Sequence, residues 1–463
     1  MIARSRPDDP APGPVRLRIP RALFEAIKGD LAAPHAHAGE RVGFISVGTK
    51  RLERGEWLIC AQEYHPLADG RYIVDSKVGA RIDGEAIREA MQRVLDTGRG
   101  GFHVHLHEHR GVPAFSRTDR AHQPRLVDAL ANVDARVPHG MLVLSEDAAH
   151  AWVRLPGAPE LVAPALVSIV GDPLTLIWPE GAPGVREDQF ARQDFLGVRA
   201  QDILARARIG VVGMGGGGSH MVQQLLHVGA LHLRVFDHDR VERSNLNRLI
   251  GATVWDVEEE TRKIGIARRL ATGLLPEHQM EARASAWQEN VDLLAGCDLV
   301  LGAVDTFAAR RDLEAFCRRY LIPYVDIGMD VHSVAGESPR MAGQVIVSLP
   351  GDRCMHCIDY LNDDRLAREA ALYGAAGGRP QVVWPNGVLA STAVGIAVDL
   401  LTGWSGVVDR ALFLSYDGNR GMLGPHPRWP YIGHGACEHF PLHQVGDPQF
   451  RAVVRVGAHP TSV

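Results

Sequence analysis

The chain has 463 residues, of which 46% are hydrophobic, and its formal net charge at pH 7 is −5. This length exceeds what one ordinary hydrophobic core can organise, so we expect two or three domains. The mild net charge gives no electrostatic reason to bind nucleic acid or anionic lipid, and neither is expected as a partner.

The first residues and the cysteine content indicate a compartment. Residues 1–14, MIARSRPDDPAPGP, are polar and proline-rich and lack the apolar core of a signal peptide. No run of 18 apolar residues occurs in the chain, so no membrane-spanning helix is expected. Six cysteines suit a reducing compartment and a metal site better than a disulfide framework. The sequence therefore predicts a cytoplasmic protein whose residues 1–14 are disordered.

Alternating histidines mark the N-terminal third of the chain. After a predicted helix over residues 83–97, the segment GGFHVHLHEHR carries His103, His105, His107 and His109. If the segment is one strand, alternation places all four side chains on one face, which favours metal binding over core packing.

Two of these histidines combine with a later carboxylate. His105, His107 and Asp119 offer two imidazoles and one carboxylate, which are ligand types of a catalytic zinc site. Glu40 could act as general base on a bound water. The pairs His103/His105 and His107/His109 remain alternative registers.

The order Glu40, His-x-His, Ser116-x-x-Asp119, together with GERVGF, resembles the JAB/MPN metalloprotease family. The resemblance implies a JAB/MPN-like domain of mixed α/β fold over residues 15–178, in which Ser116 supports Asp119. The chain departs from the family pattern where Glu108 replaces a proline and where the spacer to Ser116 is one residue longer. A docking domain without metal is the alternative. The Pro/Gly-rich residues 179–188 are predicted to be a linker.

A nucleotide-binding βαβ unit opens the second part of the chain. A strand over 208–212 is followed by a glycine-rich turn, a helix from about Ser219 and a second strand that ends at Asp237. The turn contains Gly213, Gly215, Gly216, Gly217 and Gly218. Glycines let backbone N–H groups approach a phosphate, and the helix N-terminus attracts the same negative charge. By itself the turn fits NAD, FAD or ATP.

The residues around and after the turn narrow the choice of nucleotide. FARQ…GVRAQDILARARIGVVGMGGGGS…VFDHDRVERSNLNR resembles the ThiF/MoeB/HesA family, the bacterial relatives of ubiquitin-activating enzymes, and the resemblance runs from about Gln189 to the C-terminus. It implies a Rossmann-like adenylation domain over 189–463 with a mostly parallel sheet, with ATP and Mg²⁺ bound. It also implies a homodimer, because Arg192 stands where the family's arginine reaches the ATP of the partner subunit.

The resemblance also implies individual roles. Asp237 would hold the ribose, Asp239 would lie in the same site, and Asn245, Arg248 and Lys263 would contact the nucleotide. Asp305 would bind Mg²⁺. Cations from Arg192, Arg248, Lys263 and Mg²⁺ would stabilise the charge that builds on phosphate when a carboxylate attacks it.

A second metal site is expected in the C-terminal half. Cys354-x-x-Cys357 is similar to the first half of the family's structural zinc site, and Cys437 with either His434 or His439 could complete it. Of the remaining cysteines, Cys297 and Cys317 are predicted core residues. Neither these two nor Cys60 falls clearly where a thioester cysteine is expected, so adenylation is predicted and thioester formation is left open. Residues 386–403 read as an apolar core helix.

The two resemblances together suggest an enzyme that adenylates the C-terminal glycine of a ubiquitin-like protein. The N-terminal domain would process or deconjugate that protein, and a conjugating enzyme is a further possible partner. One alternative is activation of a sulfur carrier or a peptide in cofactor or natural-product synthesis. Another is an NAD(P)-binding oxidoreductase built on the same βαβ unit.

Overall fold

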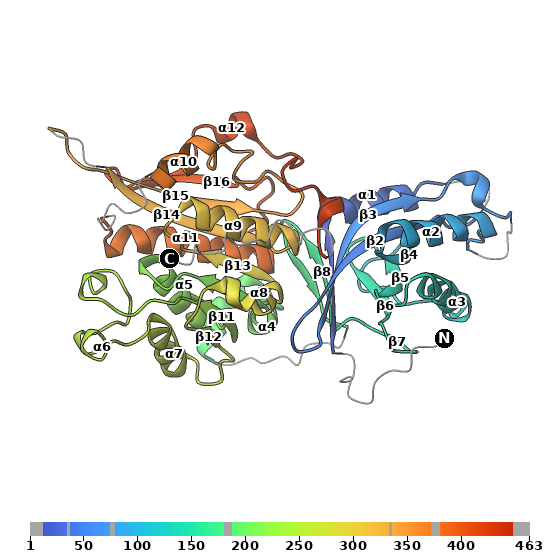
Figure 1. Ribbon diagram of the computed structural model, residues 1–463, viewed down its shortest axis with the longest axis horizontal. Coiled ribbons are helices and arrows are strands. Elements are labelled where there is room, and N and C mark those ends of the chain that lie inside the picture. The colour runs from blue at the N-terminus through green and yellow to red at the C-terminus, as the bar shows by residue number, and fades with distance from the viewer. Residues whose placement is uncertain are drawn as a thin grey trace, which may run out of the picture. The chain divides into compact units, whose positions relative to one another are not determined.

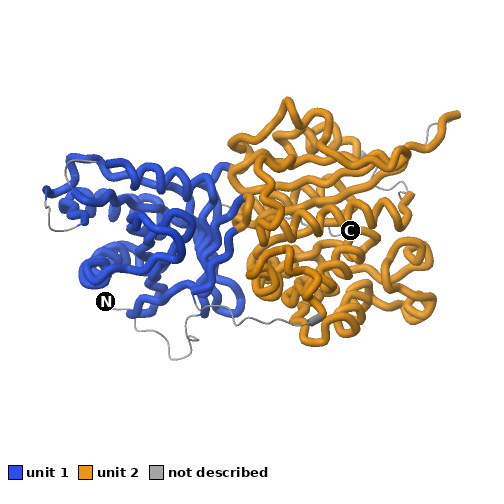
Figure 2. Tube along the Cα trace, turned by 180° about the vertical axis from the view of Figure 1, so that it is seen from behind, with its two compact units in different colours: residues 1–171, 175–182, 441–452 blue, residues 172–174, 183–440, 453–463 orange. Residues whose placement is uncertain are grey.

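The computed structural model describes residues 13–34, 38–74, 79–179, 188–332, 336–371 and 380–447. The chain separates into two compact units (Figure 2). Unit 1 comprises Met1–Gly171, Thr175–Ala182 and Pro441–Ala452, and unit 2 comprises Asp172–Leu174, Pro183–Phe440 and Val453–Val463. Residues 1–12 of the segment predicted to be disordered, and residues 180–187 of the predicted linker, lie outside the described residues.

Unit 1 is a mixed α/β unit (Figure 1). Its described elements are β1 (Val15–Pro20), α1 (Arg21–Leu31), β2 (Val42–Arg51), β3 (Trp57–Pro66), η1 (Asp69–Arg71), α2 (Gly84–Thr97), β4 (Gly100–Leu106), α3 (Arg117–Val133), β5 (His139–Leu144), β6 (Ala149–Arg154), β7 (Leu161–Val162), β8 (Leu166–Val170), β9 (Thr175–Ile177) and η5 (Leu442–Gln444). Within the described residues the strands form one nine-stranded sheet in the order β7-β6-β5-β4-β2-β3-β1-β8-β9.

Helices cover both faces of this sheet. Because neighbouring residues on a strand point to opposite faces, β2 sends Ile45 and Phe44 to different layers. Ile45 belongs to the core that contains Phe24 and Ile27 of α1. Phe44 instead packs with Ala90 and Val94 of α2 and Leu130 of α3. The sheet is therefore sandwiched between α1 and the pair α2 and α3.

A short C-terminal segment completes unit 1. Asp447 forms a β-bridge with Thr49 of β2, and Val445 is 3% exposed. The side-chain amide of Gln62 donates a hydrogen bond to the Val445 carbonyl, and a Cβ at Gly48 would lie 2.3 Å from the same oxygen. The sequence prediction placed this segment in a second domain over 189–463. These local contacts, which no sequence motif marks, assign it to unit 1 instead.

Acid is expected to destabilise unit 1 through His139, whose side chain is fully buried. Gly101 N–H donates to His139 Nδ1, and the ring's Nε2–H donates to the Asp134 carbonyl, so the imidazole is neutral. Burial lowers the pKa of His139 below 6.5. Below about pH 6.5 the unfolded chain therefore binds more protons at this residue than the folded chain does. The free energy of unfolding of unit 1 consequently falls as the pH is lowered through this range. Urea unfolding at pH 7.5 and pH 5 should show this loss of stability. In His139→Gln the loss should be smaller, by the contribution of about one bound proton.

Unit 2 is built on an eight-stranded sheet within the described residues, in the order β12-β11-β10-β13-β14-β15-β16-β17. Its elements are η2 (Asp188–Leu196), α4 (Ala200–Arg206), β10 (Arg208–Val212), α5 (Gly216–His227), β11 (His232–Phe236), η3 (Arg243–Asn245), α6 (Val254–Glu258), α7 (Lys263–Leu274), β12 (Glu281–Arg283), η4 (Trp287–Asn290), α8 (Val291–Ala295), β13 (Leu299–Gly302), α9 (Phe307–Arg319), β14 (Tyr324–His332), β15 (Arg340–Ser348), α10 (Asp363–Ala371), α11 (Val383–Thr402), β16 (Phe413–Asp417), β17 (Met422–Pro425) and α12 (Trp429–Ile432).

The parallel half of the sheet creates a binding crevice. Strands β12, β11, β10, β13 and β14 run parallel, and β15 to β17 continue antiparallel. The chain leaves β10 toward β11 and later returns to β13 on the other side of β10, so the strand order reverses between β10 and β13. Ligands bind α/β sheets at such a point, beyond the carboxyl ends of the strands. The predicted α/β class, with a mostly parallel sheet in the nucleotide unit, is confirmed.

The predicted apolar helix is α11, which ends at Gly403 in the left-handed conformation (φ 66°). Among the described helices it alone is long and apolar enough to cross a membrane, and 61% of its most apolar stretch is buried inside the structure. It packs against α5, β14 and β15. Its apolar surface is therefore used for packing within unit 2.

Candidate functional site

The glycine-rich turn joins β10 to α5. Gly213 has φ +91°, and a Cβ there would lie 2.5 Å from the Ala303 carbonyl oxygen. A Cβ at Gly218 would lie 1.8 Å from the Gly213 carbonyl oxygen. The helix begins at Gly216, earlier than the predicted Ser219, because Gly215 serves as its N-cap. No side chain caps this helix start, so its N–H groups remain for an anion.

The strain at this turn predicts different outcomes for two glycines. Gly213→Ala should lower the free energy of unfolding by about 1–3 kcal/mol, because alanine disfavours the positive φ and its methyl group meets Ala303. Gly215→Ala should change it by less than about 1 kcal/mol, since no heavy atom lies within 4 Å of the added Cβ. Urea midpoints of the full chain compare the two, and equal losses would contradict this account of the turn.

A cavity of about 340 Å³ lies over the carboxyl ends of β10, β11 and β13. Its lining contains most of the predicted nucleotide residues: Gly213, Gly215, Gly216, Asp237, Asp239, Asn245, Arg248, Lys263 and Asp305. Two predicted residues are not in the lining. Gly218 is buried beneath the turn, and Arg192 is exposed on η2.

Two aspartates organise one wall of the cavity. Asp237 Oδ2 accepts the Met214 N–H at 2.6 Å, and Oδ1 accepts the Asp239 N–H at 2.8 Å, so this side chain ties the glycine turn to the end of β11. Burial raises the pKa of Asp237. Burial acts the same way on Asp239, but the hydrogen bond and charge of Lys263, together with the charges of His238 and Arg262, outweigh it and lower the pKa of Asp239. Lys263 Nζ lies 2.7 Å from Asp239 Oδ2.

The Ser-Asn-Leu-Asn-Arg segment forms the short helix η3 and the turn after it. Asn245 Oδ1 accepts the Glu242 N–H, which fixes the start of η3. Arg248 donates to the Ser244 carbonyl at 2.6 Å and to Asn247 Oδ1 at 3.0 Å. Both of these lining side chains are therefore held by local hydrogen bonds, with the Arg248 charge at the cavity.

Sequence reasoning missed several lining residues. Asn386, at the start of α11, is 5% exposed and faces Gly216, where a Cβ would lie 2.7 Å from its Nδ2. Gln288 follows β12, and Arg310 lies in the first turn of α9. Only Asn386 carried a sequence signal, as a polar residue that opens an otherwise apolar helix.

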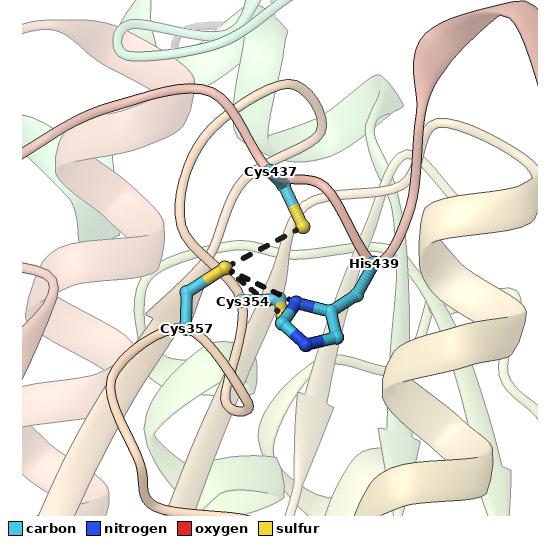
Figure 3. Close-up of side chains that lie close together, drawn as sticks. All are labelled: Cys354, Cys357, Cys437 and His439. Atoms are coloured by element: carbon cyan, nitrogen blue, oxygen red, sulfur yellow. Dashed lines mark hydrogen bonds between the residues drawn. The ribbon is translucent and has the colours of Figure 1, made fainter.

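Three cysteines and a histidine gather in unit 2 (Figure 3). The Cys354 and Cys357 sulfurs lie 3.6 Å apart, and the Cys357 and Cys437 sulfurs lie 3.8 Å apart. His439 Nδ1 is 3.6 Å from Cys354 Sγ and 3.4 Å from Cys357 Sγ. A zinc tetrahedron with ordinary bond lengths requires sulfur–sulfur edges of about 3.8 Å and sulfur–nitrogen edges of about 3.6 Å. The four side chains fit zinc.

The structure distinguishes the two histidines considered as fourth ligand. His434 Nδ1 lies 2.6 Å from Asp352 Oδ2, outside the cluster, whereas His439 belongs to it. The hydrogen bond between Cys354 and Cys437 lowers the pKa of Cys437 and raises the pKa of Cys354. The lowered pKa of Cys437 favours its thiolate, the form in which cysteine binds metal.

Helix α9 braces the loop that carries the first two cysteines. Glu314 Oε1 accepts the Met355 N–H at 2.9 Å and the Ser348 hydroxyl at 2.6 Å. Arg318 donates to the Asp352 and Arg353 carbonyls, each at 2.7 Å. One face of α9 thus fixes the backbone on both sides of Cys354.

A second cluster lies in unit 1, where His105, His107 and Asp119 come together. Asp119 Oδ2 is 3.4 Å from His105 Nε2 and 3.9 Å from His107 Nε2. These distances are close to the edge of about 3.4 Å that a zinc tetrahedron requires between nitrogen and oxygen ligands. His105 Nε2 is buried, and it faces Asp119 Oδ2 within the cluster. This donor set also fits zinc.

Ser116 holds the carboxylate of this cluster. As N-cap of α3 it accepts the Asp119 N–H at 3.1 Å, and its own N–H donates to Asp119 Oδ2 at 2.7 Å. Burial would raise the pKa of Asp119, but the hydrogen bonds from His105 and Ser116 outweigh it and hold that pKa below its usual value. Glu40 lies outside the three clustered groups. Burial lowers the pKa of His107, and the Glu40 charge opposes this shift only in part.

The four histidines do not share one strand face as predicted. β4 ends at Leu106, where the His107 N–H donates to the Leu144 carbonyl, so only His103 and His105 lie on the strand. His109 is exposed, with Nδ1 2.9 Å from the Arg110 carbonyl. Burial lowers the pKa of His103 to about 3, so it is a neutral core residue behind the cluster. Of the registers considered, His105 with His107 is the pair that meets Asp119.

The remaining cysteines are packing residues. Cys297 and Cys317 are 0% exposed and Cys60 is 1% exposed. Burial raises the pKa of Cys60 to about 12. Neither Cys297 nor Cys317 lines the nucleotide cavity, as expected for core positions.

A sequence profile described as the ThiF family matches residues 187–428, just over half of the chain. The chain belongs to the ThiF family. The match spans the glycine turn and every predicted nucleotide residue, but it ends before Cys437 and begins after the histidine cluster of unit 1. The predicted JAB/MPN-like domain therefore lies outside it.

Among curated proteins, the chain is 34% identical over 176 residues to the SAMP-activating enzyme E1 of Haloferax volcanii, covering 37% of this chain and 61% of that protein. It is 30% identical over 210 residues to the molybdopterin-synthase adenylyltransferase of Escherichia coli K12, covering 44% and 76%. It is 32% identical over 182 residues to a sulfur carrier protein adenylyltransferase of Thermus thermophilus, covering 37% and 63%. The chain thus spans about three fifths of the length of the first of these ThiF-like relatives.

Among solved structures, the E. coli protein MccB with ATP is 18% identical, with a TM-score of 0.44. The similarity covers 54% of this chain and 74% of MccB.

Proposed function

We propose that this ThiF-family chain uses ATP to adenylate the C-terminal glycine of a ubiquitin-like protein. The observation that carries the proposal is that one cavity is lined by Gly213, Asp237, Asn245, Arg248, Lys263 and Asp305. The resemblance to the ThiF family assigns these residues to the ATP site, and the family profile covers all of them. The names of the curated relatives, a SAMP-activating enzyme E1, a molybdopterin-synthase adenylyltransferase and a sulfur carrier protein adenylyltransferase, support the same chemistry.

The cavity suits attack on the α-phosphate of ATP. A carboxylate oxygen of the substrate forms a bond to phosphorus, and the bond to pyrophosphate breaks, which leaves an acyl adenylate. Negative charge grows on phosphate oxygens during this step, and Arg248 and Lys263 place positive charge at the cavity. The uncapped start of α5 offers backbone N–H groups to the phosphates. No protein nucleophile is needed.

The carboxylates in the nucleotide cavity also fit Mg²⁺. Asp239 and Asp305 line the same cavity, and carboxylate oxygens are the ligands that Mg²⁺ prefers. When bound, the ion neutralises phosphate charge. Asp305 is the residue that would hold it, while Asp237 keeps the glycine turn in place.

Exchange of radioactive pyrophosphate into ATP tests the proposal. The full chain is incubated with Mg²⁺, ATP and a ubiquitin-fold carrier protein that ends in Gly-Gly, and the control is the same carrier without both glycines. Exchange only with the intact carrier is expected. If several intact carriers support no exchange and NADH binds instead, the oxidoreductase alternative replaces the proposal.

The second candidate substrate is a sulfur carrier or a peptide rather than a conjugated modifier. The name of the Thermus thermophilus relative favours a sulfur carrier. Both candidates use the same adenylation step, so the fate of the acyl adenylate separates them. Transfer to a lysine amine or a conjugating enzyme supports the first, and thiocarboxylate formation with a sulfide donor supports the second.

Arg192 is proposed to act in the partner's cavity of a homodimer, since it is exposed on η2 and does not line the cavity of its own chain. Arg192→Ala and Lys263→Ala should each be inactive alone. Mixed and reassembled, they should regain about one quarter of wild-type exchange, because half the dimers are mixed and each has one intact site. No recovery would mean that Arg192 acts in its own chain or not at all.

As a second activity, we infer a zinc peptidase in unit 1, carried by the His105, His107 and Asp119 cluster. Zinc supplies Lewis-acid chemistry when bound. Glu40, whose charge acts on His107, is the residue that would accept a proton from the attacking water.

The full chain tests this activity with a carrier protein fused through its last glycine to a peptide. Cleavage after the glycine is expected, and His105→Ala with His107→Ala should lose both cleavage and one zinc per chain. Glu40→Gln should keep the zinc and lose the cleavage. If the wild-type chain and the variant without both histidines contain the same amount of zinc, unit 1 is a docking domain without metal.

A further inference from the structure

The start of α9 forms part of the nucleotide cavity. Asp305 and Thr306 precede the helix, Ala309 and Arg310 lie in its first turn, and all four line the cavity. Any element that holds this turn also sets where the Asp305 backbone lies.

A carboxylate from a distant helix holds the turn. Glu369 of α10 accepts the Phe307 N–H through Oε1 and the Ala308 N–H through Oε2, each at 3.0 Å. Thr306 Oγ1 accepts the next one, the Ala309 N–H, at 3.0 Å. The start of α9 is thus closed by side chains, whereas the start of α5 in the same cavity has no side-chain cap. A negative charge here also interacts favourably with the positive end of the helix dipole.

The helix that carries Glu369 is itself fixed to α9. Arg365 lies four residues earlier, on the same face of α10. Its guanidinium carbon is 5.8 Å from the centre of the Phe307 ring and 5.6 Å from the Tyr360 ring, and it donates to the Tyr360 carbonyl at 2.8 Å. Helix α10 therefore contacts Phe307, the first residue of α9, through both Glu369 and Arg365.

The other side of the loop before α9 is also clamped. Arg310 donates to the Val304 carbonyl and to the Ile327 carbonyl, and it forms a buried ion pair with Asp326. The loop between β13 and α9, which contains Asp305, is therefore held by Arg310 from inside the unit and by Glu369 from α10.

We propose that Glu369 is a positioning residue that holds Asp305 where it can meet the Mg²⁺ of bound Mg·ATP. The proposal rests on the proposed function, because it requires ATP in this cavity. Its consequence is that a residue 64 positions beyond Asp305 in the chain tunes metal-dependent nucleotide binding without touching the nucleotide.

Hydrogen exchange tests the contact itself. In the full chain, Glu369→Ala should increase deuterium uptake in the peptide that contains residues 303–310, because two backbone N–H groups lose their acceptor. Glu369→Gln, which keeps one acceptor oxygen, should give a smaller increase. Asp364→Asn on the exposed side of the same helix is the matched control and should leave this peptide unchanged. Unchanged uptake in Glu369→Ala would overturn the proposal.

Calorimetric titration with ATP tests the consequence. The quantity is the ratio of Kd for ATP in EDTA to Kd in Mg²⁺. Glu369→Ala should reduce this ratio about tenfold with little change in EDTA, and Asp305→Asn should reduce it at least as much. In the double variant Glu369→Ala should add nothing, because both act through one group.

The outcomes separate the two ideas. If the wild-type chain does not bind ATP, the proposed function fails, and the positioning role fails with it. If ATP binds with a Mg²⁺-dependent affinity that Glu369→Ala and Glu369→Gln both leave intact, only the positioning role fails. A loss of affinity that is equal in EDTA and in Mg²⁺ would make Glu369 a structural helix cap and would also overturn it.

Discussion

Lys263→Ala is expected to lower kcat/KM for carrier-dependent ATP–pyrophosphate exchange by about 10²–10³-fold. Lys263 Nζ lies 2.7 Å from Asp239 Oδ2 at the cavity, and its side chain is 12% exposed. The substitution removes a positive charge where the phosphates gain negative charge. It also removes the Lys263 charge that acts on Asp237 and Asp239, so the cavity becomes less favourable for a polyanion.

Two further variants control this experiment. Lys263→Arg keeps the charge with a different shape and should retain part of the activity. Arg240→Ala removes a charge on the same segment that pairs with Glu260 and does not line the cavity, so it should stay within about twofold of wild type. If Lys263→Ala also stays close to wild type, adenylation does not take place in this cavity.

Cys357→Ser is expected to remove one zinc per chain and to lower the free energy of unfolding of unit 2 by about 3 kcal/mol or more, because metal binding here contributes to folding. Cys357 lies within 3.8 Å of three cluster atoms, on Cys354, Cys437 and His439. Loss of the metal would remove one of the links between these two distant segments, which Asp352 also joins through His434 and Gly435. Zinc analysis and urea unfolding measure both effects.

The histidines near Cys437 provide the sharpest control. His439→Ala should lose the same zinc, whereas His434→Ala should keep it, since His434 pairs with Asp352. Cys297→Ala, in the core of the unit, should keep the zinc with a smaller loss of stability. Zinc content that does not respond to His439 would mean that the cluster has another fourth ligand.

The nucleotide half of the site could be predicted because its residues follow strands in short segments. Gly213, Asp237 and Asp305 each come directly after a parallel strand, or within a few residues of it, and such strand ends meet at one edge of the sheet. A local pattern therefore determines the spatial neighbourhood. The same holds for Ser116 and Asp119, which form one helix cap.

The rest of the site depends on contacts between distant segments. Asn386 lines the cavity and Glu369 holds the start of α9, each from a helix whose position follows from packing rather than from spacing along the chain. Spacing also left His434 and His439 equivalent, because the path of the chain around Asp352 decides between them. The strand that carries the histidines is shorter than predicted: β4 ends at Leu106, and the His107 N–H donates to the Leu144 carbonyl of the neighbouring strand β5.

The C-terminal segment that pairs with Thr49 determines when unit 1 can be finished during synthesis. Residues 13–171 leave the ribosome first, yet the acceptor for the Gln62 amide is the Val445 carbonyl near the far end of the chain. At about 5–20 residues per second, roughly 15–50 s separate the two. Through this interval the Gln62 amide and the backbone at Gly48 lack their contacts with Val445. A nascent chain stalled before residue 441 should therefore be more sensitive to protease at β2 and β3 than the released protein.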